Sequence, residues 1–247
     1  MKSDFLAFLA EGGLLQISPI NALMAGCFDG SVPVGDVLAP GVCGIGTVDG
    51  LDGELFIADG LACHVRADGM AYPLADGEKI PFGMLASLAK AETAEFPAPL
   101  SLAELTAEVD ARAGEKNAVL AFSLTGSFAR AHTRSVPRQD KPYKPLHVVT
   151  RAQPEFRLEA VEGTLVGFRF PAYFLGVNAP GWHLHLRTAD GRGGHLLDCR
   201  LLRGMARWRI LRDFRMLLPE NSAAFTAADL SRDFSAEVRE VERLGRQ

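Results

Sequence analysis

The sequence predicts an α+β fold with two mixed or antiparallel β-sheets and a few helices. Two groups of short runs with alternating apolar residues, at 44–75 and 153–213, support this prediction, because a period of two is typical of strands with one buried face. Helical periodicity does not follow each strand, so a parallel β-α-β sheet is not expected. We expect residues 1–150 to form an N-terminal mixed β-sheet domain with helices. Residues 151–247 should form a C-terminal antiparallel β domain that carries a metal site and a C-terminal helix.

Asp-Gly pairs separate the alternating runs of residues 44–75. This arrangement is a strong hairpin signal, because glycine adopts the positive φ that tight turns need. We therefore expect a β-meander in this region. A short strand is expected before it at 14–18, and a helix should begin after Pro19 because proline suits the first turn of a helix.

A helix is predicted over residues 101–114. Ser101 and Glu104 have the spacing of a capping box, apolar residues follow at helical spacing, and Gly114 ends the pattern. Strands are predicted next over 118–136 and 146–151, on either side of a proline-rich loop. The tail of the chain, at 223–244, again has helical spacing and many charged residues.

Composition limits the possible partners and location of the chain. It has 247 residues, of which 48% are apolar and 23% charged, and a formal net charge of −4 without a basic run. This balance argues against nucleic acid and against an anionic membrane as partners, because both attract clustered Lys and Arg. Neither a membrane span nor a secretory signal is recognisable. Four cysteines without a C-x-x-C spacing suggest buried free thiols in the cytoplasm.

The segment WHLHLRTADGRGGHLLD contains three of the six histidines. His183 and His185 point to the same face of a strand, because side chains alternate along it. The glycine-rich turn that follows returns the chain, so His195 should lie on the neighbouring strand. Three imidazoles on one sheet face can bind one divalent ion and leave positions open for water or substrate, and the predicted ion is zinc.

The remaining cysteine and histidines near these patterns are expected to be structural. By alternation Cys199 shares a face with His195, but it would lie about 13 Å farther along the strand, so a core position is the better prediction. His64, His132 and His147 are each isolated from the cluster and fit structural or surface positions.

Two further residues could complete a catalytic site. Glu54 stands at a hairpin corner from which its carboxylate could reach sideways, although spacing alone favours an exposed strand end. Arg134 ends a strand at the proline-rich loop, where it could hold a substrate carboxylate with two parallel hydrogen bonds. A surface salt bridge is the alternative for Arg134.

Spacing alone leaves two other classes of protein open. Cupin-like oxygenases and isomerases also use H-x-H on strands, but they usually add a glutamate a few residues later, where this chain offers Asp190 and His195. A non-catalytic protein stabilised by metal is the other alternative, and it would have a closed site with four protein ligands.

Several longer segments, in order and spread over residues 14–242, resemble the alpha-acetolactate decarboxylase family. They include the metal segment with its H-x-H and GGH elements and a segment with an LDGE core. The segments that carry the resemblance are GIGTVDGLDGELFIADG, IPFGML, TRSVPRQDKPYKPL, GFRFPAYFLGVNAPGWHLHLRTADGRGGHLLD and DLSRDFSAEVREVE.

The resemblance implies a zinc enzyme that converts the small molecule (S)-2-acetolactate to (R)-acetoin and carbon dioxide, and it implies a homodimer with sheets joined across the interface. Zinc would chelate the substrate oxygens and stabilise the enediolate, and an active-site carboxylic acid would then protonate it stereospecifically. The family's metal ligands fall on His183, His185 and His195.

The other functional positions of the family also have counterparts. Its LDGE glutamate falls on Glu54 and its arginine on Arg134, which would orient the substrate carboxylate. A carboxylate of the C-terminal segment falls on Glu242, with Glu237 and Glu240 as alternatives because the tail aligns loosely. Either Glu54 or Glu242 could be the acid.

The chain departs from the family pattern beside the metal segment. Trp182 stands where a tyrosine is common, and Leu186 where an aromatic residue is common. We expect these two changes to reshape the wall of the pocket while every proposed ligand stays in place.

Overall fold

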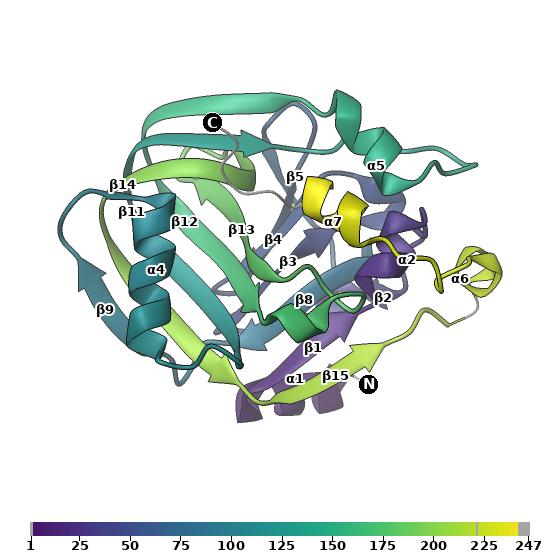
Figure 1. The fold of residues 1–247 in the computed structure, drawn as a ribbon, viewed down its shortest axis with the longest axis horizontal. Helices are drawn as coiled ribbons and strands as arrows, with labels where there is room; N and C mark the ends of the chain where they lie inside the picture. The colour runs from purple at the N-terminus through teal and green to yellow at the C-terminus, as the bar shows by residue number, and fades with distance from the viewer. Residues whose placement is uncertain (1, 221, 242–247) are drawn as a thin grey trace.

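Two β-sheets pack against each other, and one apolar core fills the space between them (Figure 1). The structure is a computed structural model that describes residues 2–220 and 222–241. Both sheets contain strands from distant parts of the chain. The α+β prediction is confirmed, because the sheets are mostly antiparallel and the helices are few.

The first sheet has seven strands in the order β15-β1-β8-β3-β4-β5-β6. Neighbouring strands in this sheet pair antiparallel, except that β1 and β15 are parallel. The predicted β-meander is confirmed, because β3 to β6 pair in sequence order. The Asp59-Gly60 turn between β4 and β5 has positive φ at both residues, as this hairpin type needs. The strands are β1 Gly13–Ile17, β3 Val42–Thr47, β4 Glu54–Ala58, β5 Leu61–Val65, β6 Ala71–Pro73, β8 Phe82–Ser87 and β15 Asp213–Leu217.

The second sheet is antiparallel and contains the longest strands of the molecule. Strand β14 pairs with both β11 and β13, and β12 joins those two, so these four strands close into a ring. The short strands β9 and β10 pair with β14. The strands are β9 Glu92–Phe96, β10 Leu100–Ser101, β11 Val119–Arg134, β12 Glu155–Phe170, β13 Gly181–Thr188 and β14 Gly193–Leu211, and a small separate sheet joins β2 Val32–Pro33 to β7 Lys79–Ile80.

The two sheets do not divide the chain at residue 150. Strands β9, β10 and β11 precede that position and belong to the second sheet, whereas β15 follows it and joins the first. The chain therefore crosses between the sheets more than once.

The helices are short, apart from α1 and α4. The predicted helix at 101–114 is confirmed as α4, with a complete capping box between Ser101 and Glu104 and a left-handed Gly114 after its end. None of the helices in the described part of the chain is long and apolar enough to cross a membrane. The helices are α1 Lys2–Glu11, α2 Ile20–Met24, α3 Val34–Val37, α4 Leu102–Ala113, α5 Leu146–Val149, α6 Ala223–Ala227 and α7 Ser235–Val241, with 3-10 turns at η1 Asp49–Leu51, η2 Thr150–Ala152 and η3 Ala172–Phe174.

The predicted strand at 146–151 is wrong, because this segment forms α5 and η2. Pro145 precedes the helix, and Leu146 and Val149 bury side chains three residues apart in the core between the sheets, while Val148 is exposed. A short apolar run fits a strand or a buried helical turn equally well, so periodicity could not decide between them.

Candidate metal and substrate site

Three buried histidines converge at the second sheet, on its side facing the first. His183 and His185 are two residues apart on β13, and His185 is directly opposite His195 on β14. Each offers a ligand atom, and these atoms lie within 4.8 Å of one another. The side chains are 5%, 1% and 3% exposed, so little water competes for their nitrogens.

Hydrogen bonds determine the tautomers of two of these rings. His185 Nδ1 lies 2.7 Å from the Leu55 carbonyl oxygen, which can only accept, so Nδ1 is the donor and Nε2 has a free lone pair. His195 Nε2 lies 3.3 Å from Nη2 of Arg134, and a guanidinium can only donate, so this Nε2 is also an acceptor.

The electrostatic environment keeps the three imidazoles neutral. Burial and, second, the positive charge of Arg134 lower the pKa of His183 to about 3. Burial, which outweighs the charges nearby, also places the pKa values of His185 and His195 well below the usual range. Neutral imidazoles are the form that binds a metal.

This donor set fits a divalent metal ion. Nε2 of His183 and Nε2 of His185 lie 3.2 Å apart, and two nitrogens that bind one zinc ion tetrahedrally at their usual bond lengths would lie about 3.3 Å apart. His185 Nε2, an acceptor, also lies 3.4 Å from Oε2 of Glu54. Two acceptors this close need a shared proton or a shared cation between them.

Glu54 is buried beside the histidines instead of exposed at a strand end. It begins β4, is 8% exposed, and lines the cavity next to His183 and His195. The preceding Gly53 has φ +84°, and a Cβ there would meet the Val65 carbonyl oxygen at 2.1 Å. The Thr47 hydroxyl donates to the Gly53 carbonyl at 2.7 Å, so the backbone before Glu54 is held in place.

Arg134 is also buried, at 8% exposure, and so it is not part of a surface salt bridge. It ends β11 directly opposite His195, and its guanidinium also donates to the Val241 carbonyl at the end of α7. Gly194 permits this approach of the strands, because a Cβ at that position would meet the Arg134 carbonyl oxygen at 2.3 Å.

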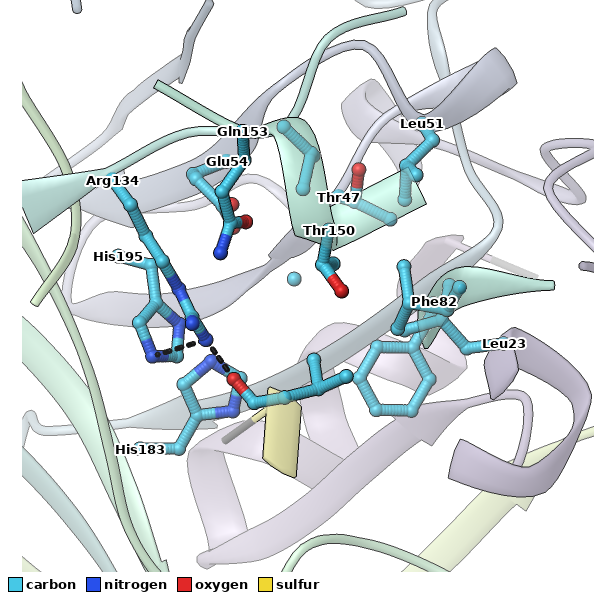
Figure 2. Close-up of a pocket in the computed structure, with 14 residues that line it drawn as sticks. Leu23, Thr47, Leu51, Glu54, Phe82, Arg134, Thr150, Gln153, His183 and His195 are labelled. Atoms are coloured by element: carbon cyan, nitrogen blue, oxygen red, sulfur yellow. Dashed lines mark hydrogen bonds between the residues drawn. The ribbon is translucent and has the colours of Figure 1, made fainter. Parts of the chain in front are cut away.

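A small cavity opens beside these groups. Figure 2 shows Glu54, Arg134 and the histidines at one side of it and apolar side chains such as Leu23 and Phe82 at the other. Such a cavity can bind the charged end of a small molecule at one side and its hydrocarbon part at the other. Its lining residues are Leu23, Gly46, Thr47, Leu51, Glu54, Phe82, Arg134, Val136, Leu146, Thr150, Gln153, His183, His195 and Val241.

Of the three candidate carboxylates of the C-terminal segment, two lie in the described part of the chain. Glu242, the first choice from the sequence, lies outside the described residues, although the preceding Val241 lines the cavity. Glu237 forms an ion pair with Arg232, and Glu240 is exposed. Neither Glu237 nor Glu240 lines the cavity that contains the histidines.

Trp182 and Leu186 do not reshape the cavity wall, contrary to expectation. They alternate with the histidines on β13 and point into the core on the opposite side of the second sheet, with the helix α4. There the Trp182 indole donates to Asp110 Oδ2 at 3.2 Å. Both departures from the family pattern therefore change that core and leave the cavity lining unaltered.

Cys199 is a buried core residue, as predicted, but it does not share the face of His195. A register shift leaves Leu197 as an extra residue on β14, since Leu196 pairs with Thr133 and Asp198 pairs with His132. This bulge reverses the alternation, so Cys199 points into the core on the side opposite to the histidines.

The other histidines lie apart from the cluster. The buried His64 donates through Nδ1 to the Asp52 carbonyl at 2.7 Å, and His132 is 2.8 Å from the Glu155 carboxylate. His147 lies on α5 instead of the expected strand.

Three polar residues of the cavity wall were not predicted as site residues. Thr47 comes from β3, whereas Thr150 and Gln153 come from η2 and the residue that ends it. None of them belongs to a local pattern with the histidines. The Gln-Pro pair at 153–154, just before a long strand, is a pattern typical of a turn or an extended segment and could have indicated an ordered turn here.

Comparisons with known proteins agree on one family. Residues 14–232 match the family model described as alpha-acetolactate decarboxylase. The chain is similar to alpha-acetolactate decarboxylases of Methanosarcina mazei and Methylococcus capsulatus. The Methanosarcina mazei protein is 39% identical, over 95% of this chain and 81% of its own length. The Methylococcus capsulatus protein is also 39% identical, over 93% of this chain and 88% of its own length. It also resembles the crystal structure of the Bacillus subtilis strain 168 enzyme, with a TM-score of 0.89, 31% identity, and coverage of 94% of this chain and 99% of that one.

Proposed function

The chain belongs to the alpha-acetolactate decarboxylase family, and from that premise we propose how its own residues carry out the reaction. It is an acetolactate decarboxylase, a carbon–carbon lyase. The observation that supports the proposal most is that neutral histidines, a buried arginine and a buried carboxylate line one small cavity.

We propose that His183, His185 and His195 hold a zinc ion. Three nitrogen ligands with open positions are typical of catalytic zinc, which when bound acts as a Lewis acid on the substrate oxygens and stabilises the charge of the enediolate. The protein's part is to keep the imidazoles neutral and oriented. The hydrogen bond from His185 to the Leu55 carbonyl does this for one ring.

Arg134 binds and orients the substrate carboxylate in this proposal. Its guanidinium lines the cavity and has a fork of donors that matches a carboxylate. When carbon dioxide leaves, the electron pair of the broken bond passes toward the ketone oxygen. Holding the bond to the carboxylate perpendicular to the ketone plane favours this transfer, and the buried hydrogen bond from Arg134 to the Val241 carbonyl limits rotation of the guanidinium.

Glu54 supplies the proton that completes acetoin. The enediolate left after loss of carbon dioxide needs one proton on carbon, and Glu54 lies inside the cavity with one oxygen 3.4 Å from His185. Delivery from a fixed side chain would place the proton on one face and make (R)-acetoin from (S)-2-acetolactate. Glu242, which lies outside the described residues, remains the alternative acid on the family resemblance.

The proposal includes a homodimer, which the family resemblance implies. Strand β15 is at the edge of the seven-stranded sheet, and Phe214 and Leu218 are large apolar side chains exposed on or beside it. Edge strands with exposed apolar residues favour pairing with another chain. Light scattering of the purified protein would measure the assembly, and a monomer at micromolar concentration would contradict this part.

One experiment tests the central proposal. The purified chain is analysed for metals, stripped with a chelator, and assayed for carbon dioxide and acetoin from racemic 2-acetolactate before and after zinc is restored. We expect about one metal ion per chain, loss of turnover on stripping, and recovery with zinc. Full turnover by the stripped protein would contradict the metal role.

A further inference from the structure

The side-chain amide of Gln153 contains a buried polar atom that lacks a hydrogen-bond partner. Its Oε1 is inaccessible to solvent and makes no hydrogen bond with any residue of 2–220 or 222–241. Burial of a carbonyl oxygen without a donor is costly, because the oxygen loses its hydrogen bonds to water and gains none in return. Such an atom in a native structure therefore suggests a ligand or water that supplies the missing donor.

Gln153 is on the wall of the proposed active site. It lines the cavity together with Glu54, Arg134, His183 and His195, and Figure 2 shows its side chain extending into that cavity. The last torsion of a glutamine side chain is broad, so rotation of the amide would turn Oε1 toward a donor on a molecule bound beside the histidines.

The backbone around Gln153 is anchored to the strand that contains Arg134. The Ser135 amide donates to the Pro154 carbonyl at 3.2 Å, and Glu155 pairs directly with Arg134 at the start of β12. Gln153 therefore has a defined distance from the arginine that we propose binds the carboxylate.

The substrate offers one hydrogen-bond donor. In a 2-hydroxy-3-oxo acid the carboxylate and the ketone only accept, whereas the hydroxyl on the carbon that carries the carboxylate can donate. If Arg134 holds the carboxylate, this hydroxyl is one carbon away from it and inside the cavity.

We propose that Gln153 is a specificity residue whose Oε1 accepts a hydrogen bond from the 2-hydroxyl of the substrate. The enzyme thereby distinguishes 2-hydroxy acids from acids of equal size that have a methyl group at this position. This inference rests on the proposed use of the cavity as the substrate site. A buried acceptor rejects a ligand that cannot donate, which gives more discrimination than an apolar wall could.

Binding of two unreactive acids tests the inference without any turnover. The probes are 2-hydroxy-2-methylbutanoate and 2,2-dimethylbutanoate, which differ by hydroxyl against methyl and lack the ketone needed for decarboxylation. Calorimetry with the zinc-loaded wild type and with Gln153→Met gives four dissociation constants. We expect the preference of the wild type for the hydroxy acid to fall about 3- to 10-fold in the variant, while the affinity for the methyl acid stays within about twofold.

Two controls separate this role from a structural one. Gln139→Met removes a glutamine amide that is hydrogen-bonded within its own loop, outside the cavity, and should leave the preference unchanged. Gln153→Glu keeps an acceptor and adds a negative charge, so both acids should bind more weakly while the hydroxyl preference persists. The inference would be overturned if Gln153→Met kept the preference for the hydroxy acid. It would also be overturned if the variant lost affinity for both acids equally.

Turnover is measured on the same wild-type sample. Absence of acetoin formation from 2-acetolactate by the wild type would contradict the proposed function, while the binding ratios would still decide the role of Gln153. With an active wild type, Gln153→Met should raise KM for 2-acetolactate more than it lowers kcat.

Discussion

Arg134 and His195 are directly opposite each other on β11 and β14, and Nη2 of the arginine lies 3.3 Å from Nε2 of the histidine. The residue that we propose binds the substrate carboxylate is therefore paired through the backbone with a proposed metal ligand. Their relative position depends on Gly194, which precedes His195 and lies against the Arg134 carbonyl.

Gly194→Ala should damage the site by moving these two strands apart. The new Cβ would meet the Arg134 carbonyl oxygen at 2.3 Å, and φ is +132° at this position, so strain of about 1–3 kcal/mol is expected. Metal content and turnover should both fall, together with the urea midpoint of unfolding. Gly60→Ala is the matched control. It also has positive φ but nothing within 4 Å of a new Cβ, and it should lose stability without losing metal.

Removal of a ligand tests the metal site directly. His183→Ala should abolish stoichiometric zinc and the release of carbon dioxide, because two imidazoles bind zinc much more weakly than three. Zinc per chain is measured by elemental analysis after dialysis. His147→Gln changes a histidine on α5 outside the cluster and should retain both properties. Full zinc content in His183→Ala would refute the ligand assignment.

Arg134→Lys should separate substrate binding from metal binding. Lysine keeps the positive charge but loses the planar fork of donors, so kcat/KM for 2-acetolactate should fall by about 10²- to 10³-fold. Zinc content should be unchanged. A variant with wild-type kcat/KM would show that this arginine does not orient the carboxylate.

Glu54→Gln should retain zinc but lose the proton donor. We expect kcat to fall by about 10²- to 10⁴-fold, and the acetoin that still forms should be closer to racemic on chiral gas chromatography. The control Glu92→Gln alters an exposed carboxylate on β9 and should behave as wild type. If Glu54→Gln kept both kcat and product chirality, Glu242 would become the better candidate for the acid.

The four cysteines should be unreactive in the folded protein at pH 8. Burial raises the pKa of Cys43 and Cys199 to about 12 and that of Cys63 to about 11, and it also raises the pKa of Cys27. Because the raised pKa leaves little thiolate at pH 8, a thiol reagent that needs thiolate reacts slowly. We expect four reactive thiols per chain only after denaturation, and rapid reaction of the native protein would contradict the buried positions.

Local patterns predicted those parts of the fold that depend on neighbouring residues. The meander of β3 to β6 follows from Asp-Gly turns, and α4 follows from its capping box and Gly114. Alternation likewise placed His183 and His185 on one face. In each case the interactions that decide the structure lie within a few residues of one another.

Longer-range contacts decided the features that the sequence did not reveal. The bulge at Leu197 reverses the face of Cys199, and it depends on how β14 pairs with β11. The helix α5 depends on burial of Leu146 against the core between the sheets. Gln153 reaches the cavity only because Pro154 and Glu155 are anchored beside Arg134.

The pairing of three strands brings the proposed metal ligands and the arginine together. His195 pairs with His185 across β13 and with Arg134 across β11, so the three imidazoles and the guanidinium converge only where β11, β13 and β14 are paired. An ion that binds this set and has no affinity for the unfolded chain would stabilise the folded state by about 4 kcal/mol at a thousand times its Kd. Metal availability would thus control the free energy of unfolding of the enzyme as well as whether it can turn over substrate.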